Sequence, residues 1–242
     1  MLRLRLPLLL ILALTLTAGL STPVHAQQGA LTLDSDGDYA STDDPTDNAL
    51  DLAGTSYSIE LWIKHDGNSA DQADVVTKFN GSNGYSLQLL GGGETPVLNF
   101  TTHRAGSFFT SNSGIPAGRW THVAVTYDAA GDTQRLYING QLDATNSGAN
   151  GPRETDATLW VGAERGGASN FASGQIDNLR IWTDARTPTE IENNYFDELR
   201  GSNSNLVALY QFNSSSSGTV SDLAESHTLT LSGDASVSGR GA

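Results

Sequence analysis

The sequence contains no cysteine in its 242 residues. The fold therefore forms without disulfides, and both thiol chemistry and a lipoprotein anchor on cysteine are excluded. A chain of this length can bury a sizeable core without covalent staples. All-β sandwiches commonly reach this size as single domains.

Lysine is nearly as scarce as cysteine. Only Lys64 and Lys78 are present, against 27 Asp and Glu residues, and the formal net charge is −14. This balance argues against nucleic acid and against anionic membrane surfaces as partners. It suits a protein that stays soluble in salt, or one that binds a divalent cation. Most of the carboxylates are interpreted as a solvated acidic surface.

Residues 1–26 are predicted to be a secretory signal peptide. Arg3 and Arg5 precede a charge-free, leucine-rich run at 6–20, and Val24-His25-Ala26 offers a small-residue cleavage site. The run is short for a bilayer span, so a permanent membrane anchor is the less favoured alternative. We expect an exported protein that is secreted, periplasmic or held at the cell surface, with no membrane insertion after removal of the signal.

Residues 27–235 are predicted to form one all-β domain. Apolar and polar residues alternate over 57–64 and 122–127, and Gly-rich and Asn-Gly turns separate the runs at regular spacing. This pattern favours a two-sheet antiparallel jelly-roll sandwich. The pair Asn139-Gly140 predicts a two-residue hairpin. Residues 236–242 are expected to be a frayed tail.

One strand, GQIDNLRI at 174–181, contains an acid that needs a physical explanation. Simple alternation places Asp177 on the same face as Leu179 and Ile181. A carboxylate in an apolar row is costly unless it is paired, hydrogen-bonded or bound to a metal. The segment after this strand begins with Thr187, Pro188 and Glu190, which predicts a short capped helix over about 188–198.

These segments, taken in order, resemble the laminin-G-like, concanavalin A-like jelly rolls in their bacterial, pentraxin-related form. The resemblance covers roughly residues 30–232. It rests on seven pieces: LDSDGDYA at 33–40, YSIELWI at 57–63, GRWTHVAVTYD at 118–128, LYING at 136–140, LWVG at 159–162, GQIDNLRIW with ARTPTEI at 174–191, and LVALYQFN at 206–213. It implies a ligand site at the sheet rim or on the concave face, with calcium common, but it does not fix the ligand.

Calcium binds six to eight oxygens from carboxylates, carbonyls and amides. Asp177 is the first candidate ligand, from its inward placement and its match to the family's Asp. Asp34 is the second, because it matches the Asp of the opening motif and the two terminal strands should be neighbours. The alternative is that Asp177 caps a turn or pairs with Arg180 or Arg186. The cluster Asp43, Asp44 and Asp47 is interpreted as a solvated loop.

The resemblance to pentraxins also suggests a rim site. Glu164 sits where one of their calcium-binding carboxylates would be, but Gly166 replaces the next acid, and the earlier loop offers Asn80 and Asn83 instead of an Asp-Asn pair. A double calcium site of the pentraxin type is therefore not expected. A weaker ligand-binding rim site at Glu164 and Asn83 stays open.

Catalytic patterns are incomplete. Glu154-Thr155-Asp156 begins the E-x-D-x-E pattern of family-16 glucanases, but the second Glu is missing. No histidine stands at a ligand spacing or beside a G-x-S-x-G serine, and His122 is interpreted as a satisfied sheet histidine. The sequence thus predicts a non-catalytic binding or adhesion module for a glycan or a surface protein. A polysaccharide-active enzyme, or an ancillary domain of one, is the alternative.

Overall fold

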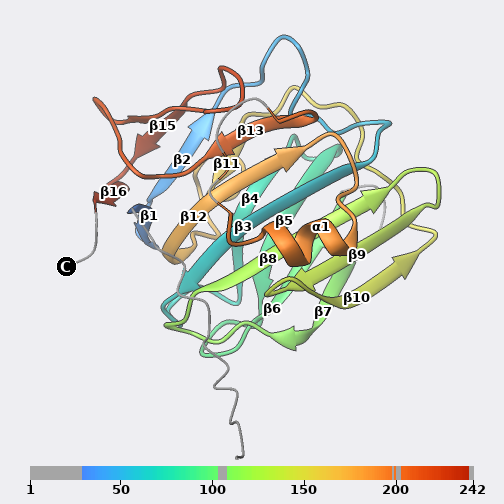
Figure 1. Cartoon of the computed structure of the whole chain (residues 1–242). Coiled ribbons are helices and arrows are strands. Elements are labelled where there is room, and N and C mark those ends of the chain that lie inside the picture. The colour runs from blue at the N-terminus through green and yellow to red at the C-terminus, as the bar shows by residue number, and fades with distance from the viewer. Residues whose placement is uncertain (1–28, 103–107, 198, 200–202, 240–242) are drawn as a thin grey trace, which may run out of the picture.

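A computed structural model describes residues 29–102, 108–197, 199 and 203–239. It confirms an all-β, two-sheet antiparallel sandwich with one short helix (Figure 1). The predicted signal peptide, residues 1–26, lies outside the described residues. Within the described ranges, no helix is long and apolar enough to cross a membrane.

The first sheet, called here the helix-bearing sheet, has eight strands. Its strands are joined in the order β10-β9-β8-β3-β12-β1-β16, and β13 also pairs with β12. The strand bounds are β1 Gly29–Asp34, β3 Tyr57–His65, β8 Thr121–Asp128, β9 Thr133–Ile138, β10 Gln141–Ser147, β12 Ser173–Trp182, β13 Leu206–Tyr210 and β16 Ser236–Gly239.

The second sheet, called the opposite sheet, also has eight strands. Their order is β14-β15-β2-β11-β4-β5-β6-β7. The strand bounds are β2 Tyr39–Thr42, β4 Gln72–Phe79, β5 Gly84–Leu90, β6 Val97–Thr101, β7 Phe108–Gly114, β11 Leu159–Val161, β14 Thr219–Val220 and β15 Leu229–Ser232.

The core lies between the two sheets. Alternate residues of each strand face inward, so that Leu61 of β3 is paired with Val123 of β8, and Leu87 of β5 with Phe100 of β6. These side chains belong to one continuous buried apolar cluster. A single core of this extent explains why the fold needs no disulfide.

The Asn139-Gly140 hairpin is confirmed. β9 ends at Ile138 and β10 begins at Gln141, and these two residues are paired. Asn139 has φ 49° and Gly140 has φ 78°. Positive φ at both central residues matches the twist of the flanking strands, and Asn-Gly is the pair that tolerates it best.

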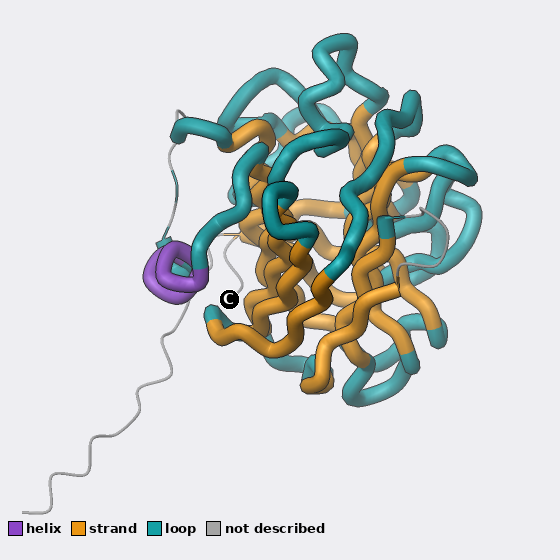
Figure 2. Tube along the Cα trace, turned by 90° about the vertical axis from the view of Figure 1, so that its right-hand side faces the viewer, coloured by secondary structure: helices purple, strands orange, loops and turns teal. Residues whose placement is uncertain are grey.

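The helix α1, Pro188–Asn194, is shorter than the predicted 188–198 and ends at the C-cap Tyr195. Its start is as predicted: the Thr187 hydroxyl accepts from the Glu190 amide, and the Glu190 carboxylate accepts from the Thr187 amide. Ile191 packs on Ala124 and Tyr137 of β8 and β9. The helix therefore covers the outer face of its sheet and stands clear of the sandwich core (Figure 2).

The expectation of a frayed tail at 236–242 is wrong for its first four residues. Ser236–Gly239 form β16, which pairs antiparallel with β1, with Val237 opposite Leu31. β1 would otherwise present an unpaired edge, and backbone groups at an edge gain hydrogen bonds from any strand that reaches them. Residues 240–242 lie outside the described residues.

β12 contains a bulge, and this overturns the predicted face of Asp177. Asp177 is paired with Trp62 and Arg180 with Glu60, so one residue more stands on β12 than on β3 between these pairs. Asn178 accommodates the extra residue by adopting a positive φ of 50°. Paired residues project to the same face, so Asp177 lies with Trp62 on the outer face, not in the apolar row of Ile181.

Candidate functional site

The two residues predicted as calcium ligands do not come together. Their strands are neighbours, as expected, but Asp34 is paired with Ser173, four residues from Asp177 along β12. At about 3.3 Å per residue this is an offset of about 13 Å. Asp34 accepts a hydrogen bond from the Asp36 amide, and Asp177 accepts one from the Asn178 amide. The pair cannot share one ion, and calcium binding by this chain stays a prediction.

The loops that carry Asn83 and Glu164 do lie side by side. The Arg165 guanidinium donates to the Asn80 carbonyl at 2.8 Å. The Glu164 carboxylate, however, accepts from Ser169 and Asn170 within its own loop. It therefore stabilises that loop. Ligand binding by Glu164 and Asn83 stays a prediction.

The same rim of the sandwich also contains a hollow, which we call the acidic recess. It has a volume of about 380 Å³. It is lined by four carboxylates, two amides and one threonine: Asp44, Asp51, Glu154, Asp156, Asn48, Asn80 and Thr155. These residues come from three segments: the β2–β3 connection, the turn after β4, and the β10–β11 connection.

A buried lysine joins these segments at the floor of the recess. The Lys78 ammonium lies 2.6 Å from a carboxylate oxygen of Asp44 and 2.6 Å from one of Asp51. It also donates to the Thr155 carbonyl at 3.0 Å. The interpretation of Asp44 as a solvated loop residue is therefore wrong, because the Lys78 charge holds it against the end of β4.

Two carboxylates of the recess face solvent. Glu154 and Asp156 are exposed, and Asp156 accepts from the Asn80 side chain at 3.2 Å. Carboxylate and amide oxygens accept hydrogen bonds, so the recess offers acceptors to a ligand rich in hydroxyl donors. The four lining acids outnumber the two nearby cations, the Lys78 ammonium and the Arg165 guanidinium beside Asn80, so the recess is negative. It should therefore repel anionic ligands.

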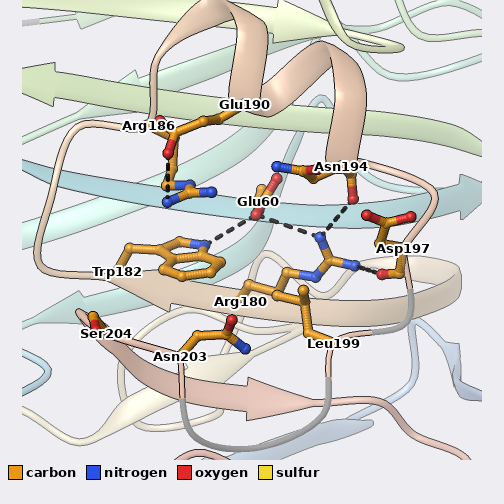
Figure 3. A pocket seen from close by; sticks show the side chains of 10 residues that line it. All are labelled: Glu60, Arg180, Trp182, Arg186, Glu190, Asn194, Asp197, Leu199, Asn203 and Ser204. Atoms are coloured by element: carbon orange, nitrogen blue, oxygen red, sulfur yellow. Dashed lines mark hydrogen bonds and ion pairs between the residues drawn. The ribbon is translucent and has the colours of Figure 1, made fainter.

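A second recess lies between α1 and the outer face of the helix-bearing sheet (Figure 3). It has a volume of about 430 Å³, and its floor is formed by Glu60, Arg180 and Trp182. Each of these side chains is less than 5 % exposed. We interpret this recess as the place where α1 is attached to the sheet, because the side chains that form its floor are buried and interact with one another.

Glu60 is the centre of that attachment. Its carboxylate accepts from the Trp182 indole at 3.0 Å, and it lies 3.3 Å from His122 and 3.5 Å from Arg180. Arg180 in turn donates to the carbonyls of Asn194 and Asp197, at the end of α1 (Figure 3). His122 is a buried residue of β8 whose Nε2 lies beside the Glu60 carboxylate, in agreement with its interpretation as a sheet histidine.

The same contacts set the charge of Glu60. Burial alone would raise the pKa of its carboxyl, but the hydrogen bonds and charges of His122, Arg180 and Trp182 outweigh burial and lower the pKa to about 2. Glu60 is therefore ionised in the folded protein at neutral pH.

This pKa predicts a pH-dependent contribution to stability. A carboxyl with a depressed folded-state pKa stabilises the fold above its unfolded pKa, near 4.5, and the contribution disappears as pH falls toward 2. The size is about 3 kcal/mol. In urea unfolding, the free-energy gap between the parent chain and Glu60→Gln should be widest above pH 5 and should shrink between pH 4.5 and 2. A gap that stays constant over this range would refute the assignment.

The residues of the acidic recess were missed as a set by the sequence analysis. Glu154 and Asp156 were noticed as an incomplete catalytic pattern, and Asn80 as a departure from the pentraxin pattern. One signal was available. Lys78 is one of only two lysines and stands in the apolar run of β4, so it required buried partners.

A family model described as the concanavalin A-like lectin/glucanases superfamily, laminin G type, matches residues 34–192. None of the curated proteins compared with the chain matches it.

Solved structures share the fold at low sequence identity. A Bacteroides ovatus protein to which carbohydrate binding is ascribed is 17 % identical, with a TM-score of 0.67. The alignment covers 89 % of this chain but 60 % of that one, so this chain spans less than two thirds of its length. The sialidase module CBM40 of Ruminococcus gnavus, solved with α2,3-sialyllactose, is 15 % identical with a TM-score of 0.54, covering 67 % of this chain and 94 % of the module.

A heptameric pentraxin of Limulus polyphemus, described as SAP-like, is 14 % identical, with a TM-score of 0.54. The match covers 69 % of this chain and 81 % of the pentraxin. At these identities the matches establish a shared fold, and carbohydrate-binding modules and lectins are among the proteins that have it. With the family match over most of its length, the chain belongs to the laminin G-like domains of the concanavalin A-like lectin/glucanases superfamily.

Proposed function

We propose that this chain is an exported, non-catalytic carbohydrate-binding module that holds a neutral glycan in the acidic recess. The observation that carries the proposal is the lining of the recess: four carboxylates and two amides around about 380 Å³ at the rim of the sandwich. Small-molecule sites span about 300–1,000 Å³, so the recess suits a short segment of a glycan rather than a long chain. The shared fold with carbohydrate-binding proteins supports this reading.

The charge of the recess defines the class of glycan. Sugar hydroxyls can donate to the carboxylates of Asp156 and Glu154, whereas a sialic or uronic acid would bring a carboxylate against them. The R. gnavus module was solved with a sialylated ligand. We expect this chain to differ from it and to bind neutral or amino sugars.

A glycan array tests the proposal. The full chain without residues 1–26 should bind neutral glycans such as β-glucans and should not bind alginates or sialosides. The array displays many copies of each glycan, which compensates for weak single-site affinity. Binding of only the acidic glycans would contradict the proposal that the acidic recess holds the ligand. An array without hits, together with retention on cell surfaces, would favour a surface-protein adhesin instead.

The absence of catalysis is tested on the same ligands. Glu154 and Asp156 are two residues apart in one connection, and the carboxylate that would complete a glucanase pattern is missing. Incubation with each glycan that binds should release no reducing sugar. Turnover that is lost in Glu154→Gln would establish the enzymatic alternative.

A further inference from the structure

We infer that the Lys78 ammonium stands in the place of a bound divalent cation at the floor of the acidic recess, so that this rim forms and binds its ligand without calcium. The statement about ligand binding rests on the proposed function. The statement about how the rim is stabilised does not, because it concerns Lys78 and its three oxygen partners alone.

Lys78 approaches the rim from inside the sandwich. It is the penultimate residue of β4 and is paired with Tyr85 on one side and Leu159 on the other, both of which face the core. Its side chain is fully buried. The aliphatic stem thus lies along apolar neighbours, and only the ammonium reaches the polar rim.

The ammonium has three N–H donors and no acceptor, and it lies among oxygens that balance its charge. It donates hydrogen bonds to Asp44 and Thr155 and forms an ion pair with Asp51. Three oxygens face it: the carboxylates of Asp44 and Asp51, each at 2.6 Å, and the Thr155 carbonyl at 3.0 Å. Each oxygen comes from a segment other than β4, so one charge joins the β2–β3 and β10–β11 connections to the opposite sheet.

Further bonds hold these oxygens in place. The second oxygen of Asp51 accepts from the Thr155 amide at 3.2 Å. The Tyr85 hydroxyl donates to the Leu50 carbonyl at 3.0 Å. Burial, together with the nearby charge of Asp51, raises the pKa of Tyr85 well above 10, so its hydroxyl keeps its proton and remains a donor. The oxygen set is therefore fixed independently of any ligand.

The same set of oxygens is of the kind that calcium selects: two carboxylates and a backbone carbonyl on irregular connections. A divalent ion cannot join them while the ammonium is there, because like charges at this separation repel strongly. The expected calcium ligands, Asp34 and Asp177, do not converge either. The buried positive charge of Lys78 thus neutralises and joins the carboxylates at this rim, as a bound cation would.

Thermal melting of the full chain, without residues 1–26, tests the inference with calcium chloride and EDTA as the only additives. The parent chain should melt at the same temperature in both. Lys78→Ala in EDTA should melt about 6–20 °C lower, since a buried pair that loses one partner costs about 3–5 kcal/mol and each kcal/mol shifts Tm by about 2–4 °C. Calcium at about 100 times its Kd should return about 5–10 °C of this loss.

A second variant and a matched control sharpen the test. Lys78→Gln keeps the first two methylenes of the stem and adds an amide oxygen, so it too should gain thermal stability from calcium. Lys64→Ala removes the other lysine of the chain, which is half-buried on β3, and should show no response to calcium. A calcium response in both Lys78 variants and in neither the parent nor Lys64→Ala supports the inference.

Two results would overturn it. One is a fall of several degrees in the Tm of the parent chain on addition of EDTA. The other is that neither Lys78 variant is stabilised by calcium, including the case in which neither folds when calcium is present. If the melting results hold but no glycan binds on the array, the proposed function fails and the role of Lys78 stands.

Discussion

Replacing Arg180 by methionine is expected to destabilise the fold by about 3–5 kcal/mol, a loss as large as that expected for Lys78→Ala. Arg180 is 2 % exposed, and its guanidinium lies 3.5 Å from the equally buried Glu60. Methionine would leave Glu60 with a buried negative charge and one cationic neighbour fewer. The carbonyls of Asn194 and Asp197 would lose their donor as well.

Urea unfolding of Arg180→Met and of two companions measures this effect. Arg186→Met is the matched control: its guanidinium stacks on Trp182 at 4.3 Å and pairs with Glu190, but it lies nearer the surface, so its loss should cost about 1 kcal/mol. Glu60→Gln/Arg180→Met should recover part of the loss, because no buried charge is left unpaired. Equal losses for Arg180→Met and Arg186→Met would refute the role of Arg180.

The architecture could be predicted because its signals are local. Alternation in β3 and β8, the Asn139-Gly140 turn and the capping box at Thr187 each lie within a few residues of the sequence. Each depends on backbone geometry that nearby side chains determine. Seven such segments in the family's order were enough to predict the sandwich.

Asp177 shows where local reading fails. Strict alternation placed it in the apolar row, but the bulge at Asn178 shifts the pairing by one residue and turns Asp177 to the outer face. A one-residue slip moves every following side chain to the other face. The position of the bulge depends on how β12 pairs with β3, which lies more than 100 positions earlier in the chain. A local sequence pattern contains no information about this pairing.

The acidic recess was not predictable for a related reason. Asp44 and Asp51 precede Glu154 and Asp156 by about a hundred positions, and they meet because β2, β11 and β4 are adjacent in the opposite sheet. Each acid alone looks like part of a solvated surface. Only the rarity of lysine, and the position of Lys78 in an apolar strand, indicated that some of these acids had a buried partner.

Loss of the two exposed acids of the recess is the second large effect that we expect. Glu154→Gln/Asp156→Asn keeps the shape of both side chains and removes their charges. A hydrogen bond to a charged group contributes about 1.5–3 kcal/mol, so affinity for a neutral glycan should fall about 10- to 100-fold. The Tm should barely change, because both residues are exposed and neither touches Lys78 in the network at the floor.

The control for this variant changes the same charge at the other end of the sandwich. Asp71→Asn/Glu94→Gln alters two exposed acids next to the start of β4 and the end of β5, whereas the recess adjoins the end of β4. If net charge alone governed binding, the two double variants would lose affinity equally. If the recess holds the glycan, only Glu154→Gln/Asp156→Asn will lose affinity for it.

Isothermal titration with the best neutral glycan from the array, on the parent chain and on both double variants, shows directly whether the acidic recess holds the glycan. We expect a 10- to 100-fold rise in Kd for Glu154→Gln/Asp156→Asn, because charged hydrogen bonds are lost, and an unchanged Kd for Asp71→Asn/Glu94→Gln. An unchanged Kd for Glu154→Gln/Asp156→Asn would contradict the claim that the acidic recess is the glycan-binding site.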